Sequence, residues 1–145
     1  MIGRQDTIFF LRTDADKRQK DLAISLGRQR GLLQDIQQKL QMLENYLLQY
    51  RQQAVAAEKS GILSVQALDM RHFIHQLEQV LQIQKVNLEH QRHHVAQLQS
   101  QWVTARGQEK GLAALARRLE SEQRDRELRK IQKELDEWAN RSARF

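Results

Sequence analysis

The hydrophobic residues of this sequence recur in alternating steps of three and four over most of its length. Residues 32–50, LLQDIQQKLQMLENYLLQY, show this most clearly, with glutamine and charged residues between the apolar positions. An average step of 3.5 residues is typical of a coiled coil, in which one narrow edge of a helix packs against a partner. This first seam predicts a helix over about residues 5–58. Its members are Ile8, Leu11, Ala15, Arg18, Leu22, Leu26, Gln29, Leu33, Ile36, Leu40, Leu43, Leu47, Tyr50, Ala54 and Ala57.

A turn and a second seam follow. Residues 59–64 break the pattern and contain Gly61, a typical helix C-terminal residue, and Ser64, a typical N-cap. A connection this short joins antiparallel neighbours. The sequence therefore predicts an all-α fold, a long two-stranded antiparallel coiled-coil hairpin with Tyr50 near Ile74. The second seam consists of Met70, Ile74, Leu77, Leu81, Gln84, Leu88, Gln91, Val95, Leu98, Trp102 and Ala105.

We expect residues 1–145 to form a single coiled-coil domain, with the second helix over about residues 65–140 and extending beyond the first. Counting residues outward from the turn, we expect the first helix to end opposite about residue 116 of the second helix, so that later residues have no partner. Gly107 and Gly111 are expected to weaken the helix in this part of the sequence. The three-and-four spacing then resumes in a new phase at Leu128, Ile131, Leu135 and Trp138. This overhanging terminal helix carries an apolar stripe with no partner in the chain, which makes it a candidate partner site.

The composition supports long helices and excludes several kinds of site. The 145 residues include no proline, and proline costs about 3 kcal/mol in a helix interior. The absence of cysteine excludes disulfides and thiolate chemistry. No apolar run is long enough to span a bilayer, and the first residues show no signal-peptide pattern. The net charge of +6 raises nonspecific attraction to nucleic acid, anionic membranes or acidic proteins, but acidic residues are interleaved with the basic ones.

The sequence shows no pattern of a catalytic or cofactor site. It has no glycine-rich phosphate loop, no GxSxG and no CxxC. His90 and His94 stand four residues apart, as zinc ligands do, but no acidic residue completes an HExxH pattern. The basic residues before the first seam are diluted by Asp14, Asp16 and Asp21, unlike those of a DNA-binding basic zipper. We therefore expect no enzymatic activity, no cofactor, no metal and no nucleic-acid partner.

Some apolar residues lie off both seams. Tyr46 and Phe73 flank the seams, where they either widen the core or form an exposed patch for another protein. The sequence leaves both interpretations open. The full set is Tyr46, Leu48, Phe73, Ile83, Val86 and Val103.

The order and spacing of the aromatic residues, in a cysteine-free hairpin of this length, resemble the flagellar export protein family FliJ. The resemblance covers nearly the whole chain. It implies a non-enzymatic component of the flagellar type III export apparatus. The matching features are LxxLxxYxxxY at Leu40 to Tyr50, SGI at Ser60 to Ile62, FIxxLE at Phe73 to Glu78, Trp102, and LDEWANRSA at Leu135 to Ala143.

Proteins of this family resemble the central stalk of rotary ATPases. The resemblance implies that the terminal end of the hairpin enters the hexameric flagellar export ATPase and promotes its assembly and ATP hydrolysis. It implies that another part contacts the membrane export gate protein, and that export chaperones are further partners. The protein is then expected to be a monomer when alone. Its expected location is cytoplasmic, peripherally associated with the inner face of the cell membrane at the flagellar base.

Two surfaces follow from these expectations. The gate-binding patch matches the family at Leu43, Tyr46, Tyr50, Phe73 and Leu77. Lys39 and Gln84 depart from the glutamine and histidine that relatives carry there. The tip that enters the ATPase ring is expected to consist of Ile8, Phe9, Phe10, Leu11, Leu128, Ile131, Leu135 and Trp138.

Three other functions stay open from the sequence. The nearest is the equivalent stalk of a virulence-type injectisome, which shares the architecture. Another is an oligomeric coiled-coil scaffold whose seams mediate self-association, and the last is a basic nucleic-acid-binding helix. The turn favours an intramolecular hairpin over the scaffold.

Overall fold

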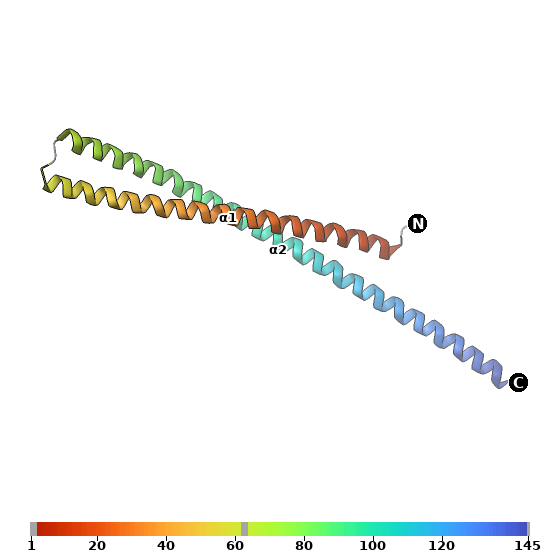
Figure 1. The fold of residues 1–145 in the computed structure, drawn as a ribbon. Helices are drawn as coiled ribbons and strands as arrows, with labels where there is room; N and C mark the ends of the chain where they lie inside the picture. Colours follow the sequence, from red (N-terminus) through yellow and green to blue (C-terminus); the bar gives the residue numbers. More distant parts are fainter. Residues whose placement is uncertain (1–2, 62–63, 145) are drawn as a thin grey trace. The chain divides into compact units, whose positions relative to one another are not determined.

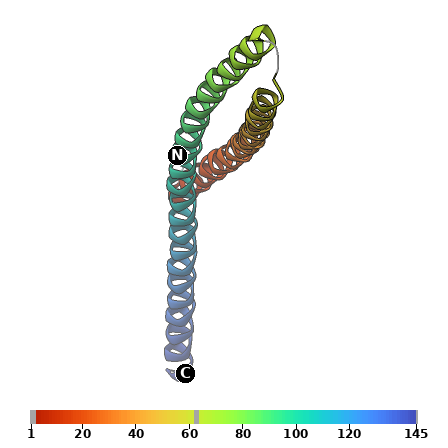
Figure 2. The same ribbon diagram turned by 90° about the vertical axis from the view of Figure 1, so that its left-hand side faces the viewer.

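The protein folds into two long α-helices joined by a short turn (Figure 1). The computed structural model describes residues 3–61 and 64–144, in which α1 spans Arg4–Lys59 and α2 spans Ser64–Ala143. Helix α2 runs antiparallel to α1 over the part of the chain next to the turn (Figures 1 and 2). No strand occurs in the described part of the chain. The predicted all-α coiled-coil hairpin is confirmed.

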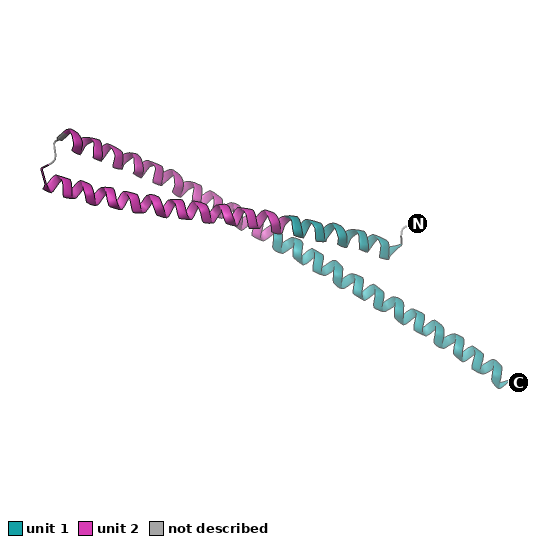
Figure 3. Ribbon diagram, in the orientation of Figure 1, with its two compact units in different colours: residues 1–21, 102–145 teal, residues 22–101 magenta. Residues whose placement is uncertain are grey.

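The chain divides into two compact units, coloured separately in Figure 3. Unit 1 comprises Met1–Asp21 and Trp102–Phe145, and unit 2 comprises Leu22–Gln101. Each unit therefore contains a segment of α1 and a segment of α2. That the chain forms a single domain stays a prediction.

Unit 2 is the hairpin around the turn. Its core is a single line of aliphatic side chains, because two helices cover only one narrow edge of each other. The Tyr50 and Phe73 rings meet edge to face, with centroids 4.8 Å apart, which agrees with the predicted antiparallel register. The buried members of the line are Leu26, Leu47, Leu81 and Leu88, and half-buried residues at the other seam positions of this unit flank them.

The end of α1 shows how the chain begins its turn. Gly61 has φ +75°, a left-handed conformation that a residue without Cβ adopts at little cost. The backbone nitrogen of Ser60 donates to the oxygen of Ala56 at 3.1 Å, closing the last turn of the helix. Ser64 is the first residue of α2, but its side chain lies outside the described part, so its role as a cap is untested. Ile62, part of the SGI feature, also lies outside it.

In unit 1 the seam on α1 differs from the prediction. Leu11 is 42% exposed and Arg18 is exposed, so placing them in the seam was wrong. Arg12 and Gln19 are half-buried in their place, on either side of the buried Ala15. Both sets of positions keep the three-and-four spacing. The observed set half-buries two long polar side chains, which sequence polarity does not reveal, because the aliphatic part of such a side chain can lie against a neighbouring helix.

On α2, unit 1 begins with a half-buried tryptophan. The Arg106 guanidinium lies over the Trp102 ring, 5.2 Å from its centroid, and Ala105 is buried beside it. The buried indole Nε1 of Trp102 has no hydrogen-bond partner in the described part of the chain. Half-buried residues continue on this side of α2 as far as Leu119.

The last part of α2, beyond Arg126, has no packing partner within the described chain. Gln5 and Gln123 still join the two segments by a side-chain hydrogen bond, slightly beyond the predicted limit near residue 116. Every residue from 120 to 144 is exposed. The segment is rich in Glu, Lys, Arg and Gln, which are good helix formers. Local contacts four residues apart add support, such as Gln132 Nε2 donating to Asp136 Oδ1 at 3.1 Å. Gly107 and Gly111 do not interrupt the helix.

Candidate partner-binding surfaces

The described residues contain no group of three or more His, Cys, Asp or Glu side chains arranged to hold a metal ion. His90 and His94 are both exposed on α2. Neither α1 nor α2, over the residues described, has an apolar stretch long enough to cross a membrane. The features that stand out are apolar surfaces suited to binding other proteins.

The aromatic flank of unit 2 contains the residues predicted for the export gate, and we use this name for Leu43, Tyr46, Tyr50, Phe73 and Leu77. The structure brings all five together, because the antiparallel register sets Tyr50 against Phe73. Leu43, Tyr50 and Leu77 are half-buried at the seam, while Tyr46 and Phe73 are 47% and 41% exposed. The two outer rings are therefore partly covered and partly exposed to solvent. That the exposed part binds another protein stays a prediction.

Met42 and Val80 extend the aromatic flank, and the sequence analysis missed them. Met42 lies one turn before Tyr46 on α1, and Val80 lies two turns after Phe73 on α2, on the same side of the hairpin. Both are exposed. Methionine adapts its shape to different partners. The signal was available, since each stands at a helical spacing from an aromatic residue already singled out.

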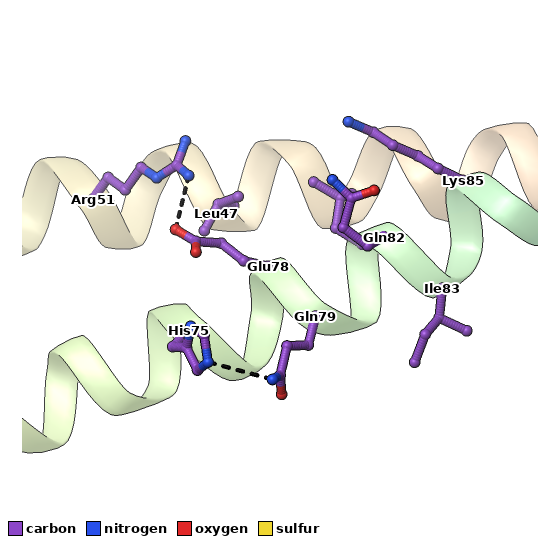
Figure 4. Close-up of a pocket in the computed structure, with 9 residues that line it drawn as sticks. Leu47, Arg51, His75, Glu78, Gln79, Gln82, Ile83 and Lys85 are labelled. Atoms are coloured by element: carbon purple, nitrogen blue, oxygen red, sulfur yellow. Dashed lines mark hydrogen bonds and ion pairs between the residues drawn. The ribbon is translucent and has the colours of Figure 1, made fainter.

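The opposite flank of unit 2 is ionic. Arg51 on α1 pairs with Glu78 on α2 at 2.9 Å, and Arg71 pairs with Glu58 at the same distance. Figure 4 shows the first pair bridging the two helices, beside the buried Leu47. Exposed pairs of this kind add little stability. The contrast leaves the hairpin with one side suited to apolar contact and one side that is charged.

One ion pair in unit 1 shifts a pKa. The ammonium of Lys20 lies 2.9 Å from the carboxylate of Asp16, one turn earlier on α1. The hydrogen bond and the negative charge of Asp16 raise the pKa of Lys20, and Glu109 on α2 adds to the effect. Both side chains are exposed, so this pair has no sign of a catalytic or binding role.

The residues predicted for the ring-inserted tip fall into two separate groups in unit 1. Ile8 is half-buried and, with Phe9, lines a groove with Ala116 and Leu119 of α2. The first group is therefore partly engaged in the hairpin, although Phe9 and Phe10 are 72% and 73% exposed.

The second group, the overhang stripe, consists of Leu128, Ile131, Leu135 and Trp138, and all four are exposed. From Leu119 to Leu128 along α2 is about 13 Å at 1.5 Å per residue, which separates this group from the first. At about 100° per residue, Leu128 and Leu135 lie about 180° and 160° around the helix axis from Leu119. Leu128 and Leu135 thus face away from the side of α2 that α1 covers, whereas Ile131 and Trp138, about 120° and 100° from Leu119, lie to one side of it.

A model of the family described as flagellar FliJ protein matches residues 9–144 of the chain. The chain belongs to the FliJ family. The FliJ resemblance drawn from the aromatic spacing is thereby confirmed over nearly the whole sequence. Comparisons with curated proteins and with solved structures find no match.

FliJ membership makes the chain a component of the flagellar protein export apparatus, a type III secretion system. The family is a non-catalytic part of that apparatus, which fits a surface built of apolar contact residues. The family match leaves untested which residues contact which partner. The roles of the aromatic flank and of the overhang stripe are therefore predictions.

Proposed function

We propose that the protein is the non-enzymatic central stalk of the flagellar export ATPase and couples that enzyme to the membrane export gate. The observation that carries the proposal is the exposed overhang of α2. The helix continues from residue 127 to 144 with no packing partner in the described chain and presents four large apolar residues there, so it needs another protein to cover it.

We assign the overhang stripe to the hexameric ATPase, whose assembly and ATP hydrolysis it promotes. A single helix is narrow enough to lie within a protein ring, and its polar remainder keeps it soluble there. Ile8, Phe9, Phe10 and Leu11 form the second part of this tip. Of these, Phe9 and Phe10 are the most available for contact, because Ile8 already packs at the seam.

We assign the aromatic flank to the export gate. Its exposed rings are held by the seam beneath them, so they present apolar area with little loss of side-chain freedom on binding. Met42 and Val80 belong to this surface in our proposal. Export chaperones are further partners, and the protein works in the cytoplasm, peripherally associated with the inner face of the membrane at the flagellar base.

The test of the proposal is ATP hydrolysis by the flagellar export ATPase of the same genome, with and without this protein. We expect faster hydrolysis and a complex of ring size on a sizing column. The Leu135→Ala, Trp138→Ala double variant should lose both effects. Its matched control is Lys130→Ala with Glu137→Ala, which changes two residues on the other side of the same helix.

Two results would redirect the proposal. If the wild-type protein stimulated only the ATPase of a virulence-type injectisome encoded in that genome, it would be the stalk of that system. If it affected neither enzyme, the stalk function would be wrong.

A further inference from the structure

The face of α2 that points away from α1 in unit 2 carries a repeat of 18 residues. Residues 65–79 and 83–97 share the pattern of aliphatic, aliphatic, His, His and Gln at identical spacing. We call this surface the histidine face. The first copy is Val65, Leu68, His72, His75 and Gln79, and the second is Ile83, Val86, His90, His93 and Gln97.

A spacing of 18 residues has a special geometric meaning on a helix. It equals five turns of 3.6 residues, so both copies point in the same direction, about 27 Å apart along the axis. All ten side chains are exposed. Figure 4 shows Ile83 and Gln79 on the side of α2 away from α1.

The two copies also repeat a local contact. The amide nitrogen of Gln79 lies 3.3 Å from Nε2 of His75, and that of Gln97 lies 3.3 Å from Nε2 of His93. These contacts hold each ring against its own helix. Each copy thus presents two imidazoles, His72 with His75 or His90 with His93, next to a small aliphatic patch. A metal would bind through Nδ1 or take the place of the glutamine at Nε2.

Two imidazoles three residues apart are half of a metal site. Zn²⁺ in a closed protein site takes four ligands, and imidazole is among its preferred ones. Since no group of three or more metal-ligating side chains occurs in the described chain, the missing two ligands would have to come from another molecule. The repeat identifies a molecule that carries them in the right arrangement: a second copy of this chain.

We propose that Zn²⁺, or a transition metal of the same ligand preference, joins two copies of the protein through their histidine faces in an antiparallel pair. A two-fold axis midway between Gln82 and Ile83 sets His72 and His75 of one copy against His93 and His90 of the other. By symmetry this happens twice, giving two sites of four imidazoles each. Both sites form at once because the two copies of the repeat point the same way.

The aliphatic residues of this face support the pairing without being sufficient for it. Ile83 lies next to the axis, where it meets its own counterpart. Four small aliphatic side chains per copy offer far less than the about 800 Å² per partner of a standard stable interface. The protein is therefore a monomer without metal and a dimer with it. This inference is independent of the proposed stalk function.

The test is light scattering with stepwise addition of Zn²⁺ and, separately, a chelator. We expect the 17.1 kDa mass of the monomer to double with two Zn²⁺ bound per pair of chains, and to return on chelation. A wild-type protein that stays monomeric, or that grows beyond a dimer, would overturn the proposal.

Two double variants test the arrangement itself. His72→Ala with His75→Ala, and His90→Ala with His93→Ala, should each abolish the dimer, because every site needs one pair of each kind. A mixture of the two variants should restore a dimer with a single Zn²⁺. Dimers from either variant alone, or none from the mixture, would exclude the antiparallel pairing.

His94→Ala is the matched control, because Gln76 stands at its place in the first copy of the repeat. This variant should dimerise like the wild type, and a loss would show that His90 and His94 are the ligands instead. Since all the changed side chains are exposed, circular dichroism should give unchanged helicity and melting for every variant. A drop in helicity would count against the assignment of these residues to a free face.

Discussion

Gln91 on α2 reaches across unit 2 to Gln29 on α1. Its amide nitrogen donates to the side-chain oxygen of Gln29 at 2.9 Å and to the backbone oxygen at 3.0 Å. Both residues are half-buried at seam positions. An amide pair in an apolar seam is satisfied only when its two members lie opposite each other, so it favours one register of the hairpin.

Replacing one member of this pair should destabilise the hairpin, and replacing both should not. Gln91→Leu leaves the Gln29 amide unpaired, and we expect the free energy of unfolding to fall by about 1 kcal/mol. Gln29→Leu should have a smaller effect, because Gln91 keeps its bond to the backbone oxygen. The double variant should be at least as stable as the wild type. Urea unfolding of the four proteins measures this, and equal stabilities for all four would show that the pair has no energetic role.

Leu47 and Leu48 offer a matched test of the seam. They are neighbours of the same residue type, yet Leu47 is 4% exposed and Leu48 is 56% exposed. Leu47→Asp should lower the free energy of unfolding by several kcal/mol, on the order of 3–5, because it places an unpaired charge in the core. Leu48→Asp should change it by less than about 0.5 kcal/mol. Thermal melting followed by circular dichroism distinguishes them, and a similar loss in both would contradict the assigned seam.

Replacing Trp102 by phenylalanine should cost less stability than the loss of side-chain volume alone would suggest. Trp102→Phe removes some packing contacts but also removes a buried indole N–H that has no hydrogen-bond partner. Because the second effect offsets the first, we expect the free energy of unfolding to change by less than about 1 kcal/mol. Trp102→Ala removes the ring itself and should cost about 2–4 kcal/mol. Trp138→Ala serves as the control, since Trp138 is 65% exposed and should not affect melting. A loss for Trp102→Phe as large as that for Trp102→Ala would show that the N–H does form a bond in solution.

The exposed rings of the aromatic flank should matter more for export than for folding. In the Tyr46→Ala, Phe73→Ala double variant we expect the free energy of unfolding to fall by only about 1–2 kcal/mol, because both side chains are nearly half exposed, although Phe73 loses its edge-to-face contact with Tyr50. Stimulation of the ATPase should persist while flagellar export falls, as measured by swimming and by secreted flagellar subunits. Leu48→Ala with Val55→Ala is the control, as both residues are exposed elsewhere on α1. If the aromatic variant melted much earlier than this control, the rings would belong to the core and the patch would be wrong.

Most of the fold was predictable because the contact residues of a coiled coil recur at a regular spacing along the sequence. Leu26, Leu47, Leu81 and Leu88 are all buried where the seams placed them. The errors at Leu11 and Arg18 share a physical cause. Near the end of α1 two sets of positions share the same period, and the choice depends on how the stems of Arg12 and Gln19 lie against α2, which hydrophobicity along the sequence does not record.

The candidate surfaces were predictable to different degrees. Tyr46 and Phe73 were singled out because aromatic residues off a seam are conspicuous, and the antiparallel register then brought them to one flank. Met42 and Val80 were overlooked because their role depends on which side of the hairpin they occupy. The repeat of the histidine face can be read in the sequence itself, but only the packing of α2 against α1 shows that its residues are exposed.

The unpacked end of α2 also has a consequence for how the chain is broken down. A helix held only by its own hydrogen bonds frays readily from its free end, since isolated helices are marginally stable in water. Proteases need an extended substrate, so they should cut first among residues 120–144, where basic residues are plentiful. Digestion should then slow at the segment that α1 covers. A partner that encloses the overhang would protect it, so the lifetime of the intact chain would depend on whether it has been assembled.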